Sequence, residues 1–236
     1  MEKSPVRPLN IFIGFDPLES VAFHGCVHSL MTHASQPLSL NPLNLDNLLD
    51  HFDRPRDPKQ SNTFSFSRFL VPYLMEFEGW ALFMDCDMML RTDVLRVFEA
   101  VEQNPGKAVY VVKHDYEIKE TTKYLNTVQY SYPRKNWSSF VLWNCSHPSN
   151  RAVTREWVHE ATGLELHRFT WLKDDEIGEL DIRWNWLVGD YCNPPEDVYN
   201  VHWTLGGPYF NEYQNVDFAP EWFSMRDRMM YCHQRA

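Results

Sequence analysis

The sequence lacks the features that mark secreted and membrane-spanning proteins. Of its 236 residues only five are cysteines, and none belongs to a Cys-x-x-Cys pair. An odd number of widely spaced cysteines excludes a regular disulfide framework and favours reduced thiols. No apolar run reaches the roughly 18 residues that a membrane-spanning helix needs, and no signal-peptide segment is recognisable. The sequence therefore predicts a cytoplasmic protein with at most peripheral membrane contact.

Positive charge and glycine are also scarce. Lys and Arg number 22 against 32 Asp and Glu, a formal charge of −10. This balance argues against general binding to nucleic acid or to an anionic membrane. An enzyme acting on an anionic substrate remains compatible with it, because a bound cation supplies local positive charge. The nine glycines include no Gly-x-Gly-x-x-Gly, which counts against a dinucleotide site.

What is present suits one α/β domain. Hydrophobic residues make up 44% of the chain and aromatic residues 15%, ample for a core. Apolar runs predict buried strands, and periodic patterns predict helices between them. We expect a first strand that breaks into a turn within residues 9–17, and further strands at 39–45, 80–84 and 108–112. Another apolar strand is expected after the polar residues of the run 133–144. We expect helices at 19–33, at 93–101 capped by Thr92, at 151–162 ended by Gly163, and at the C-terminus.

The run Trp80–Leu90 carries the most specific signal. Its apolar first half reads as a central strand covered on both faces, and Asp85 and Asp87 follow at its end. In extended backbone, residues two apart project to the same side. Two carboxylates leaving a buried strand must be hydrogen-bonded, protonated or bound to a cation. A divalent metal is one solution, and capping of the following turn is the alternative.

An upstream segment makes the metal interpretation more specific. Arg68 lies in the run Arg-Phe-Leu-Val-Pro-Tyr-Leu, which precedes the apolar strand ending in Met-Asp-Cys-Asp. This combination resembles the donor-site half of family 8 glycosyltransferases. The resemblance implies a GT-A fold: one Rossmann-like α/β domain with a mostly parallel central sheet flanked by helices. It also implies a nucleotide-sugar donor and manganese held by the Asp-x-Asp motif.

The resemblance extends to later segments. Ser138 and Ser139, before an apolar strand, match a small pair that contacts the donor sugar, although Trp137 replaces the family's Asn. Their hydroxyls could bind a sugar hydroxyl or equally satisfy backbone groups at the strand end. Asp175 and Glu176, followed by Trp-Asn, match the family's Asp-Gln pair. Adjacent acids are otherwise a solvated surface in most proteins.

A histidine and two glycines complete the match. His202, followed by Gly206 and Gly207, resembles the family's His-x-x-Gly motif with one extra residue and without its phosphate-binding Lys. A neutral imidazole suits manganese beside two carboxylates, and glycine lets the backbone approach a diphosphate. Arg68, Lys135 or the metal would then neutralise the diphosphate.

By the resemblance, an arm at residues 1–8 precedes a domain at 9–236. About 9–115 would be the nucleotide-binding half and 116–236 the acceptor and donor-sugar half. Asp85, Asp87 and His202 would bind Mn²⁺ or Mg²⁺. The predicted donor-binding residues are Phe15, Asp16, Arg68, Asp85, Cys86, Asp87, Lys135, Ser138, Ser139, Gly206 and Gly207.

The predicted reaction moves a hexose or N-acetylhexosamine from a UDP-sugar to a glycan or lipid-linked acceptor with retention of configuration. Arg68, Asp175 and Glu176 are the predicted catalytic residues. Glu176 could serve as a nucleophile, but same-face attack is favoured. A sugar nucleotidyltransferase and a catalytically weak nucleotide-sugar-binding protein stay open, as does a homodimer; no nucleic-acid partner is expected.

Overall fold

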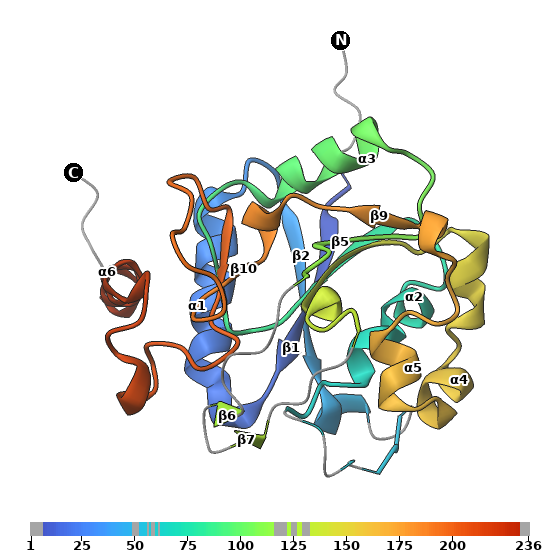
Figure 1. Ribbon diagram of the computed structural model, residues 1–236, viewed down its shortest axis with the longest axis horizontal. Helices are drawn as coiled ribbons and strands as arrows, with labels where there is room; N and C mark the ends of the chain where they lie inside the picture. The colour runs from blue at the N-terminus through green and yellow to red at the C-terminus, as the bar shows by residue number, and fades with distance from the viewer. Residues whose placement is uncertain are drawn as a thin grey trace.

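The computed structural model describes residues 7–48, 52–55, 57, 60, 62–115, 122–123, 127–128 and 133–231. They form a central sheet with helices on both sides (Figure 1). The six strands lie in the order β2-β1-β3-β8-β5-β9. Their bounds are β1 Leu9–Phe15, β2 Leu38–Asn44, β3 Trp80–Met84, β5 Val109–Val111, β8 Phe140–Asn144 and β9 Ile177–Glu179.

The sheet is mixed and mostly parallel, as predicted. Strands β1, β2 and β3 run parallel to one another, and β9 runs parallel to β5. Strand β8 is antiparallel to both of its neighbours, β3 and β5. Because Phe140 pairs with Met84, the residues that enter β8 lie beside the residues that leave β3. This reversal brings the segment around Ser138 and Ser139 to Asp85.

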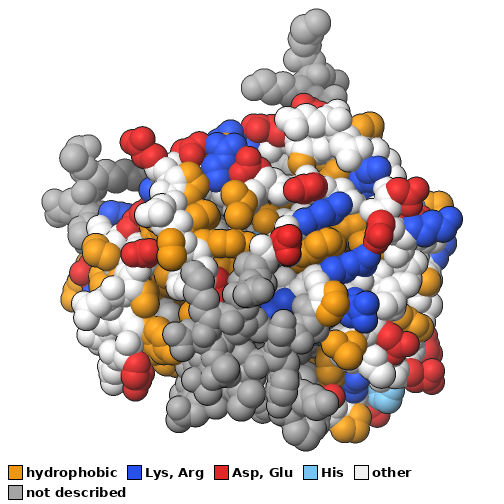
Figure 2. Space-filling model, in the orientation of Figure 1, with side chains coloured by type: hydrophobic (Ala, Val, Ile, Leu, Met, Phe, Trp, Pro, Cys, Tyr) orange, Lys and Arg blue, Asp and Glu red, His pale blue; other side chains and the backbone are white. Residues whose placement is uncertain are grey.

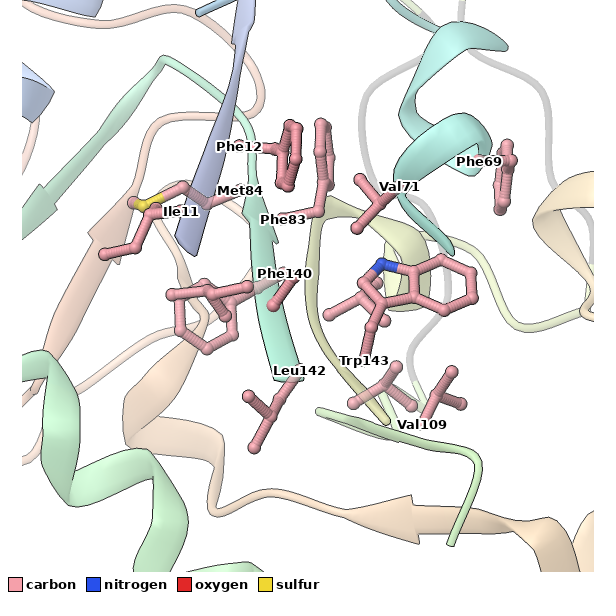
Figure 3. Close-up of a cluster of buried hydrophobic side chains, with 14 of the residues drawn as sticks. Ile11, Phe12, Phe69, Val71, Phe83, Met84, Val109, Phe140, Leu142 and Trp143 are labelled. Atoms are coloured by element: carbon pink, nitrogen blue, oxygen red, sulfur yellow. The ribbon is translucent and has the colours of Figure 1, made fainter. Parts of the chain in front are cut away.

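The core justifies reading apolar runs as strands. Phe83, Leu142 and Trp143, on the two central strands, are almost completely buried. Figure 3 shows these side chains packed together with residues of β1 and β5. A strand covered on both faces has no polar face, so its sequence is continuously apolar. The predicted bounds 80–84 are those of β3, and β8 is the apolar strand expected after the polar residues of the run 133–144.

A second, three-stranded sheet lies beside the first. Its order is β10-β11-β4, formed by Trp186–Leu187, Asn200–His202 and Met88–Leu90. It has its own hydrophobic cluster, to which Trp222 and Met225 of the C-terminal helix α6 (Ala219–Met230) contribute. Helix α6 also packs on α1 (Ser20–His33). The C-terminal helix is therefore confirmed as a cover for core residues.

Two helix boundaries differ from prediction. Asp93, and not Thr92, caps the 3₁₀ helix Val94–Phe98, because its carboxylate accepts the Leu95 N–H; α3 (Glu99–Gln103) follows. Gly163 begins a helix instead of ending one. The region contains two short helices, α4 (Arg155–Glu160) and α5 (Gly163–His167). Thr162 and Glu165 form a capping box at the start of α5, which outweighs the signal of glycine as a terminator.

The remaining elements are short. The Arg68 segment forms a 3₁₀ helix, Ser67–Leu70, continued by α2 (Val71–Leu74), and Thr122–Lys123 (β6) pairs with Thr127–Val128 (β7). Most of the predicted arm, and residues 116–121, 124–126 and 129–132, lie outside the described residues. Within the described part, no helix has the length and hydropathy needed to cross a bilayer. On the face in Figure 2, basic and acidic side chains alternate around hydrophobic ones.

Candidate metal and donor site

Two sheets meet at the predicted metal ligands. Asp85 and Asp87 lie in the turn between β3 of the large sheet and β4 of the small one. His202 is the last residue of β11, and the antiparallel register sets it opposite Met88. The Trp203 N–H also donates to the Asp87 carbonyl at 3.0 Å. The pairing of β11 with β4 thus places His202 next to the end of β3.

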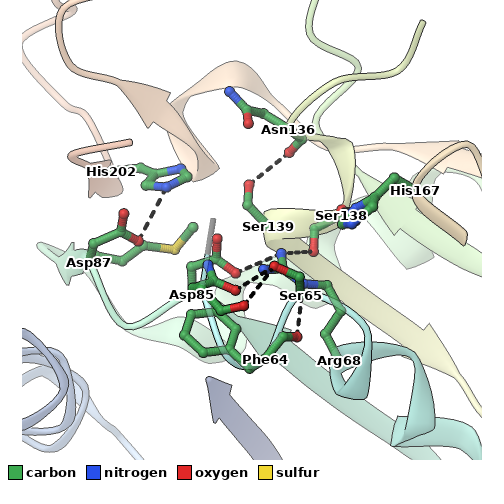
Figure 4. Close-up of polar contacts among 12 residues, drawn as sticks. Phe64, Ser65, Arg68, Asp85, Asp87, Asn136, Ser138, Ser139, His167 and His202 are labelled. Atoms are coloured by element: carbon green, nitrogen blue, oxygen red, sulfur yellow. Dashed lines mark hydrogen bonds and ion pairs between the residues drawn. The ribbon is translucent and has the colours of Figure 1, made fainter. Parts of the chain in front are cut away.

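The three side chains converge. One potential ligand atom from each of Asp85, Asp87 and His202 lies within 4.8 Å of the others, and all three residues are buried. His202 Nε2 lies 3.2 Å from Asp87 Oδ1. Figure 4 shows the imidazole facing Asp87, with Asp85 alongside. This Asp-Asp-His group is the one set of three or more clustered His, Cys, Asp or Glu ligands in the described part of the chain.

The charge of the Asp-Asp-His group fits a divalent cation. Arg68 Nη1 lies 2.8 Å from Asp85 Oδ1, so one cation faces two buried carboxylates. Buried charges need a partner, and a divalent ion would supply it. Two carboxylate oxygens and an imidazole nitrogen suit Mn²⁺ or Mg²⁺. The donor set therefore fits the metal that the sequence predicted.

Cys86, between the two acids, does not belong to this donor set. It is buried in the main hydrophobic core. Burial, followed by the nearby carboxylates of Glu19 and Asp87, raises the pKa of its thiol well above the ordinary value. The thiol stays protonated, and metal ligation requires thiolate. Cys86 is therefore not a metal ligand, and its side chain packs in the core, while its predicted contact with the donor stays a prediction.

Arg68, Ser138 and Ser139 lie together at the Asp85 side. The Ser139 carbonyl accepts the Asp85 N–H at 2.9 Å, and the Ser138 carbonyl accepts from Arg68 Nη1 at 3.1 Å. Ser138 Oγ lies 2.7 Å from His167 Nδ1 (Figure 4). The antiparallel entry of β8 explains this arrangement, and these predicted residues do adjoin the metal ligands.

Sequence reasoning missed His167 and His114. His167 ends α5 and packs edge-on against Phe69, with ring centroids 5.2 Å apart. No local pattern marks it, because its helix was not predicted. His114 follows β5 at the carboxyl edge of the sheet, where α/β proteins place ligands, and that position was a usable signal.

The buried His114 and the half-buried Tyr191 form a polar pair near His202. His114 Nδ1 lies 2.9 Å from the Tyr191 hydroxyl. Burial, then the charge of His202, lowers the pKa of His114 to about 3. Burial, then Asp190 and Asp115, raises the pKa of Tyr191 to about 12. Both side chains are consequently neutral at ordinary pH, so the hydrogen bond between them joins two uncharged groups.

Phe15 and Asp16 lie at the predicted edge of the sheet. Ile13 pairs with Met84, so the end of β1 adjoins the end of β3. The two Asp16 carboxylate oxygens accept the N–H groups of Leu18 and Thr63, both at 3.0 Å. Asp16 therefore caps the helical turn after β1, and its second hydrogen bond holds the Thr63 backbone beside that turn. Contact with a nucleoside stays a prediction.

The two glycines are explained by packing. A Cβ on Gly206, whose φ is +141°, would lie 2.6 Å from the Tyr213 ring. A Cβ on Gly207 would lie 2.3 Å from the Tyr209 ring. The Gly206 N–H donates to the Trp203 carbonyl at 2.9 Å, so the turn already uses one N–H that we predicted for diphosphate binding.

The role of Lys135 in neutralising a diphosphate stays a prediction. It is partly buried and directly precedes Asn136, whose carbonyl accepts from Ser139 Oγ. Its position in the chain is therefore next to the segment that enters β8, beside Asp85.

Asp175 and Glu176 lie at the opposite end of the sheet. Glu176 precedes β9, and the pairing Ile177–Val109–Trp143–Ala81 sets it level with Trp80. From Trp80 to Asp85 is about 16 Å of strand, and β9 lies three strand spacings, about 14 Å, from β3. The structure therefore does not bring this acidic pair to the Asp-Asp-His group, because the motif did not reveal at which end of β9 the pair lies.

Glu176 instead fixes a turn. Its carboxylate accepts from Ser149 Oγ and from the Lys173 N–H, and these hydrogen bonds lower its pKa. Glu176→Gln and Asp175→Asn are expected to retain sugar-transfer or donor-hydrolysis rates within about twofold, below roughly 0.4 kcal/mol in the barrier. Steady-state kinetics on both variants would check this. A loss of several orders of magnitude in either would return the pair to the active site.

Comparison with known proteins identifies the fold. No protein-family model matches the sequence. Galactosyltransferase LgtC, solved with donor and acceptor sugar analogues, aligns with a TM-score of 0.59 and 9% identity over 96% of this chain and 98% of its own. Mouse xyloside xylosyltransferase 1 aligns with a TM-score of 0.55 and 11% identity over 86% and 100%. The bifunctional glycosyltransferase WbbM aligns with a TM-score of 0.64 and 13% identity over 96% of this chain. This chain spans 51% of the WbbM chain.

These likenesses, with the Asp-Asp-His group at the end of β3, define a protein of the GT-A glycosyltransferase fold, similar to family 8 enzymes. Protein CDI of Arabidopsis thaliana is 40% identical to this chain over 227 residues, which is 94% of this chain and 87% of that protein. The chain belongs to the Protein CDI family.

Proposed function

We propose that this protein is a metal-dependent glycosyltransferase. It moves a hexose or N-acetylhexosamine from a UDP-sugar to a hydroxyl of a glycan or lipid-linked acceptor, with retention of configuration. The observation that carries the proposal is the convergence of Asp85, Asp87 and His202 within 4.8 Å at the end of β3, in a chain of GT-A fold. His202 lies far from Asp85 and Asp87 in the sequence and reaches them through the pairing of β11 with β4.

The Asp-Asp-His group would hold Mn²⁺ or Mg²⁺. A metal bound there supplies Lewis-acid stabilisation of the negative charge that grows on departing UDP. Arg68 contributes a fixed cation at the same place, since its guanidinium contacts both Asp85 and the Ser138 carbonyl. This double contact holds it in one orientation, so no reorganisation is needed as charge develops.

Retention then follows from same-face attack. The position of Glu176, at the far end of the sheet, argues against a covalent intermediate on that carboxylate. Ser138, whose carbonyl accepts from Arg68, and His167, which contacts Ser138 Oγ, are the candidates for orienting sugar hydroxyls. A hydroxyl and an imidazole can both donate and accept hydrogen bonds, which suits this task.

A nucleotide-sugar-binding protein without turnover is the second candidate. The residues after Gly207 include Tyr209 and Phe210 but no Lys, and the Tyr209 hydroxyl donates to Glu19 at 3.3 Å. Diphosphate neutralisation here depends more heavily on Arg68 and the metal. Weak stabilisation of the leaving group would favour binding over turnover.

A panel of nucleotide sugars, with and without Mn²⁺, tests the proposal. At 100 times its Kd a ligand stabilises the folded state by about 2.7 kcal/mol. For a chain of this size that raises Tm by roughly 5–10 °C. We expect this shift with one or more UDP-sugars only in the presence of metal, accompanied by slow UDP release measured by NMR.

The other outcomes discriminate among the candidates. A thermal shift without UDP release indicates the binding protein. Pyrophosphate release from UTP and a sugar phosphate indicates a nucleotidyltransferase. No shift with any nucleotide sugar in the presence of Mn²⁺ refutes the proposal.

A further inference from the structure

Asn185 is fully buried and lies between Ser139 and His202. It follows the 3₁₀ helix Ile182–Trp184 and directly precedes β10. Its Oδ1 lies 2.8 Å from His202 Nδ1, and its Nδ2 lies 2.8 Å from Ser139 Oγ. Asn185 therefore connects Ser139, just before β8, to the His202 imidazole on β11. The strands β8 and β11 belong to different sheets.

The direction of these hydrogen bonds follows from the Asn136 carbonyl. That oxygen can only accept, and Ser139 Oγ lies 2.7 Å from it, so the serine hydroxyl donates there. Because its one hydrogen is used in that bond, Ser139 Oγ can only accept from Asn185. The amide NH₂ of Asn185 therefore faces Ser139. The same NH₂ lies 3.4 Å from the Asn136 carbonyl. A flipped amide would face that carbonyl with a second oxygen.

The orientation of the amide sets the protonation pattern of the imidazole. With NH₂ toward Ser139, Asn185 Oδ1 faces His202 and can only accept, so His202 Nδ1 carries a hydrogen. The other ring nitrogen, Nε2, is the one that faces Asp87. A ligating histidine needs this arrangement, with one nitrogen held by an acceptor and the other aimed at the metal.

We infer that Asn185, oriented by Ser139 and the Asn136 carbonyl, is a positioning residue that keeps hydrogen on His202 Nδ1 and so presents Nε2 to the metal. This rests on the proposed metal site. It also gives Ser139 a different role from its predicted one: its hydroxyl orients Asn185 instead of a sugar.

One short segment governs both sides of the metal site. Asn136 has left-handed backbone geometry, φ 63° and ψ 0°, which Asn tolerates better than most residues. Its carbonyl accepts both the N–H and the hydroxyl of Ser139. The Ser139 carbonyl in turn accepts the Asp85 N–H. Residues 136–139 thereby fix the backbone of one metal ligand and, through Asn185, the side chain of another.

The first test is ¹⁵N NMR of the histidine rings in the metal-free wild-type protein, with the His202 signal identified by its loss in His202→Gln. Nitrogen shifts distinguish N–H from bare ring nitrogen. We expect Nδ1 of His202 to carry hydrogen. A bare Nδ1 overturns the inference, and this test does not depend on any variant of Asn185 folding.

The second test is Mn²⁺ affinity, measured by electron paramagnetic resonance without nucleotide. Asn185→Leu removes the acceptor, and we expect Kd to rise about 10–100-fold. Asn185→Asp keeps an oxygen facing Nδ1 and is expected to restore most of the affinity. Metal-free circular dichroism and thermal melting establish that each variant is folded.

The two hypotheses fail separately. Asn185→Leu that is folded and binds Mn²⁺ with wild-type affinity overturns the positioning role and leaves the proposed function standing. Weaker Mn²⁺ binding by Asn185→Leu, restored in Asn185→Asp, supports the positioning role. If no UDP-sugar is turned over in the same protein, the absence of turnover refutes only the transferase.

Discussion

Asp87→Asn is expected to abolish metal-dependent activity while leaving the protein folded. The substitution keeps the size of the side chain but removes one of two anionic ligands in the Asp-Asp-His group. A metal contributes several kcal/mol to stabilising transition-state charge, and each 1.36 kcal/mol is tenfold in rate. We expect kcat for UDP release to fall by at least about 1,000-fold. Mn²⁺ affinity, measured by paramagnetic resonance, should fall in parallel.

Stability should respond in the opposite sense. In the metal-free protein Asp85 is paired with Arg68, and Asp87 adds a second buried carboxylate beside that pair. Neutralising Asp87 removes repulsion between like charges, so metal-free Asp87→Asn should unfold at a denaturant concentration no lower than the wild type. Mn²⁺ should then raise that midpoint in the wild type and leave it unchanged in the variant.

Asp175→Asn is the matched control, because it is the same chemical change at the far end of the sheet. It should retain both metal binding and activity. If Asp87→Asn keeps wild-type Mn²⁺ affinity, the Asp-Asp-His group is not the metal site. If both variants lose activity equally, the loss reflects general damage instead of ligand removal.

The elements that the sequence predicted best are those with a single physical cause. Residues 80–84 and 140–144 are buried on both faces, so continuous hydrophobicity alone defined β3 and β8. Asp85 and Asp87 were recognisable because charge at the end of such a strand has few explanations. His202 was found only through resemblance, and the register between β4 and β11 explains its position.

The residues that the sequence did not predict depend on tertiary contacts. Asp175 and Glu176 matched a motif, but only strand pairing reveals that they precede β9, at the end of the sheet away from Asp85. The role of Asn185 depends on Ser139, 46 residues earlier, and on the direction of hydrogen bonds between them. Gly163 was misread because its neighbours Thr162 and Glu165 cap a helix that begins there.

Arg68→Met is expected to destabilise the metal-free protein by about 3–5 kcal/mol, the usual cost of removing one partner of a buried ion pair. The Arg68 and Asp85 side chains are only 6% and 11% exposed. Methionine replaces the aliphatic part of arginine but leaves the Asp85 carboxylate without the guanidinium and the Ser138 carbonyl without the donor Nη1. Urea denaturation of metal-free protein would measure the loss.

Arg96→Met provides the control on the same kind of contact. Arg96 Nε lies 2.9 Å from Glu99 Oε1, but both side chains are exposed, at 40% and 56%. Exposed pairs contribute little, so this variant should unfold close to the wild type. Equal midpoints for Arg68→Met and the wild type would show that Asp85 does not depend on Arg68 for its charge.

The metal dependence of this loss connects Arg68 to the site. A divalent cation bound to Asp85 replaces part of the missing positive charge, so Mn²⁺ should stabilise Arg68→Met more than it stabilises the wild type. Arg68→Lys should behave differently: it keeps the charge, but an ammonium lacks the planar fork that contacts Asp85 and the Ser138 carbonyl together. We therefore expect Arg68→Lys to recover stability more fully than kcat, because the fixed orientation of the cation matters most where the leaving group gains charge.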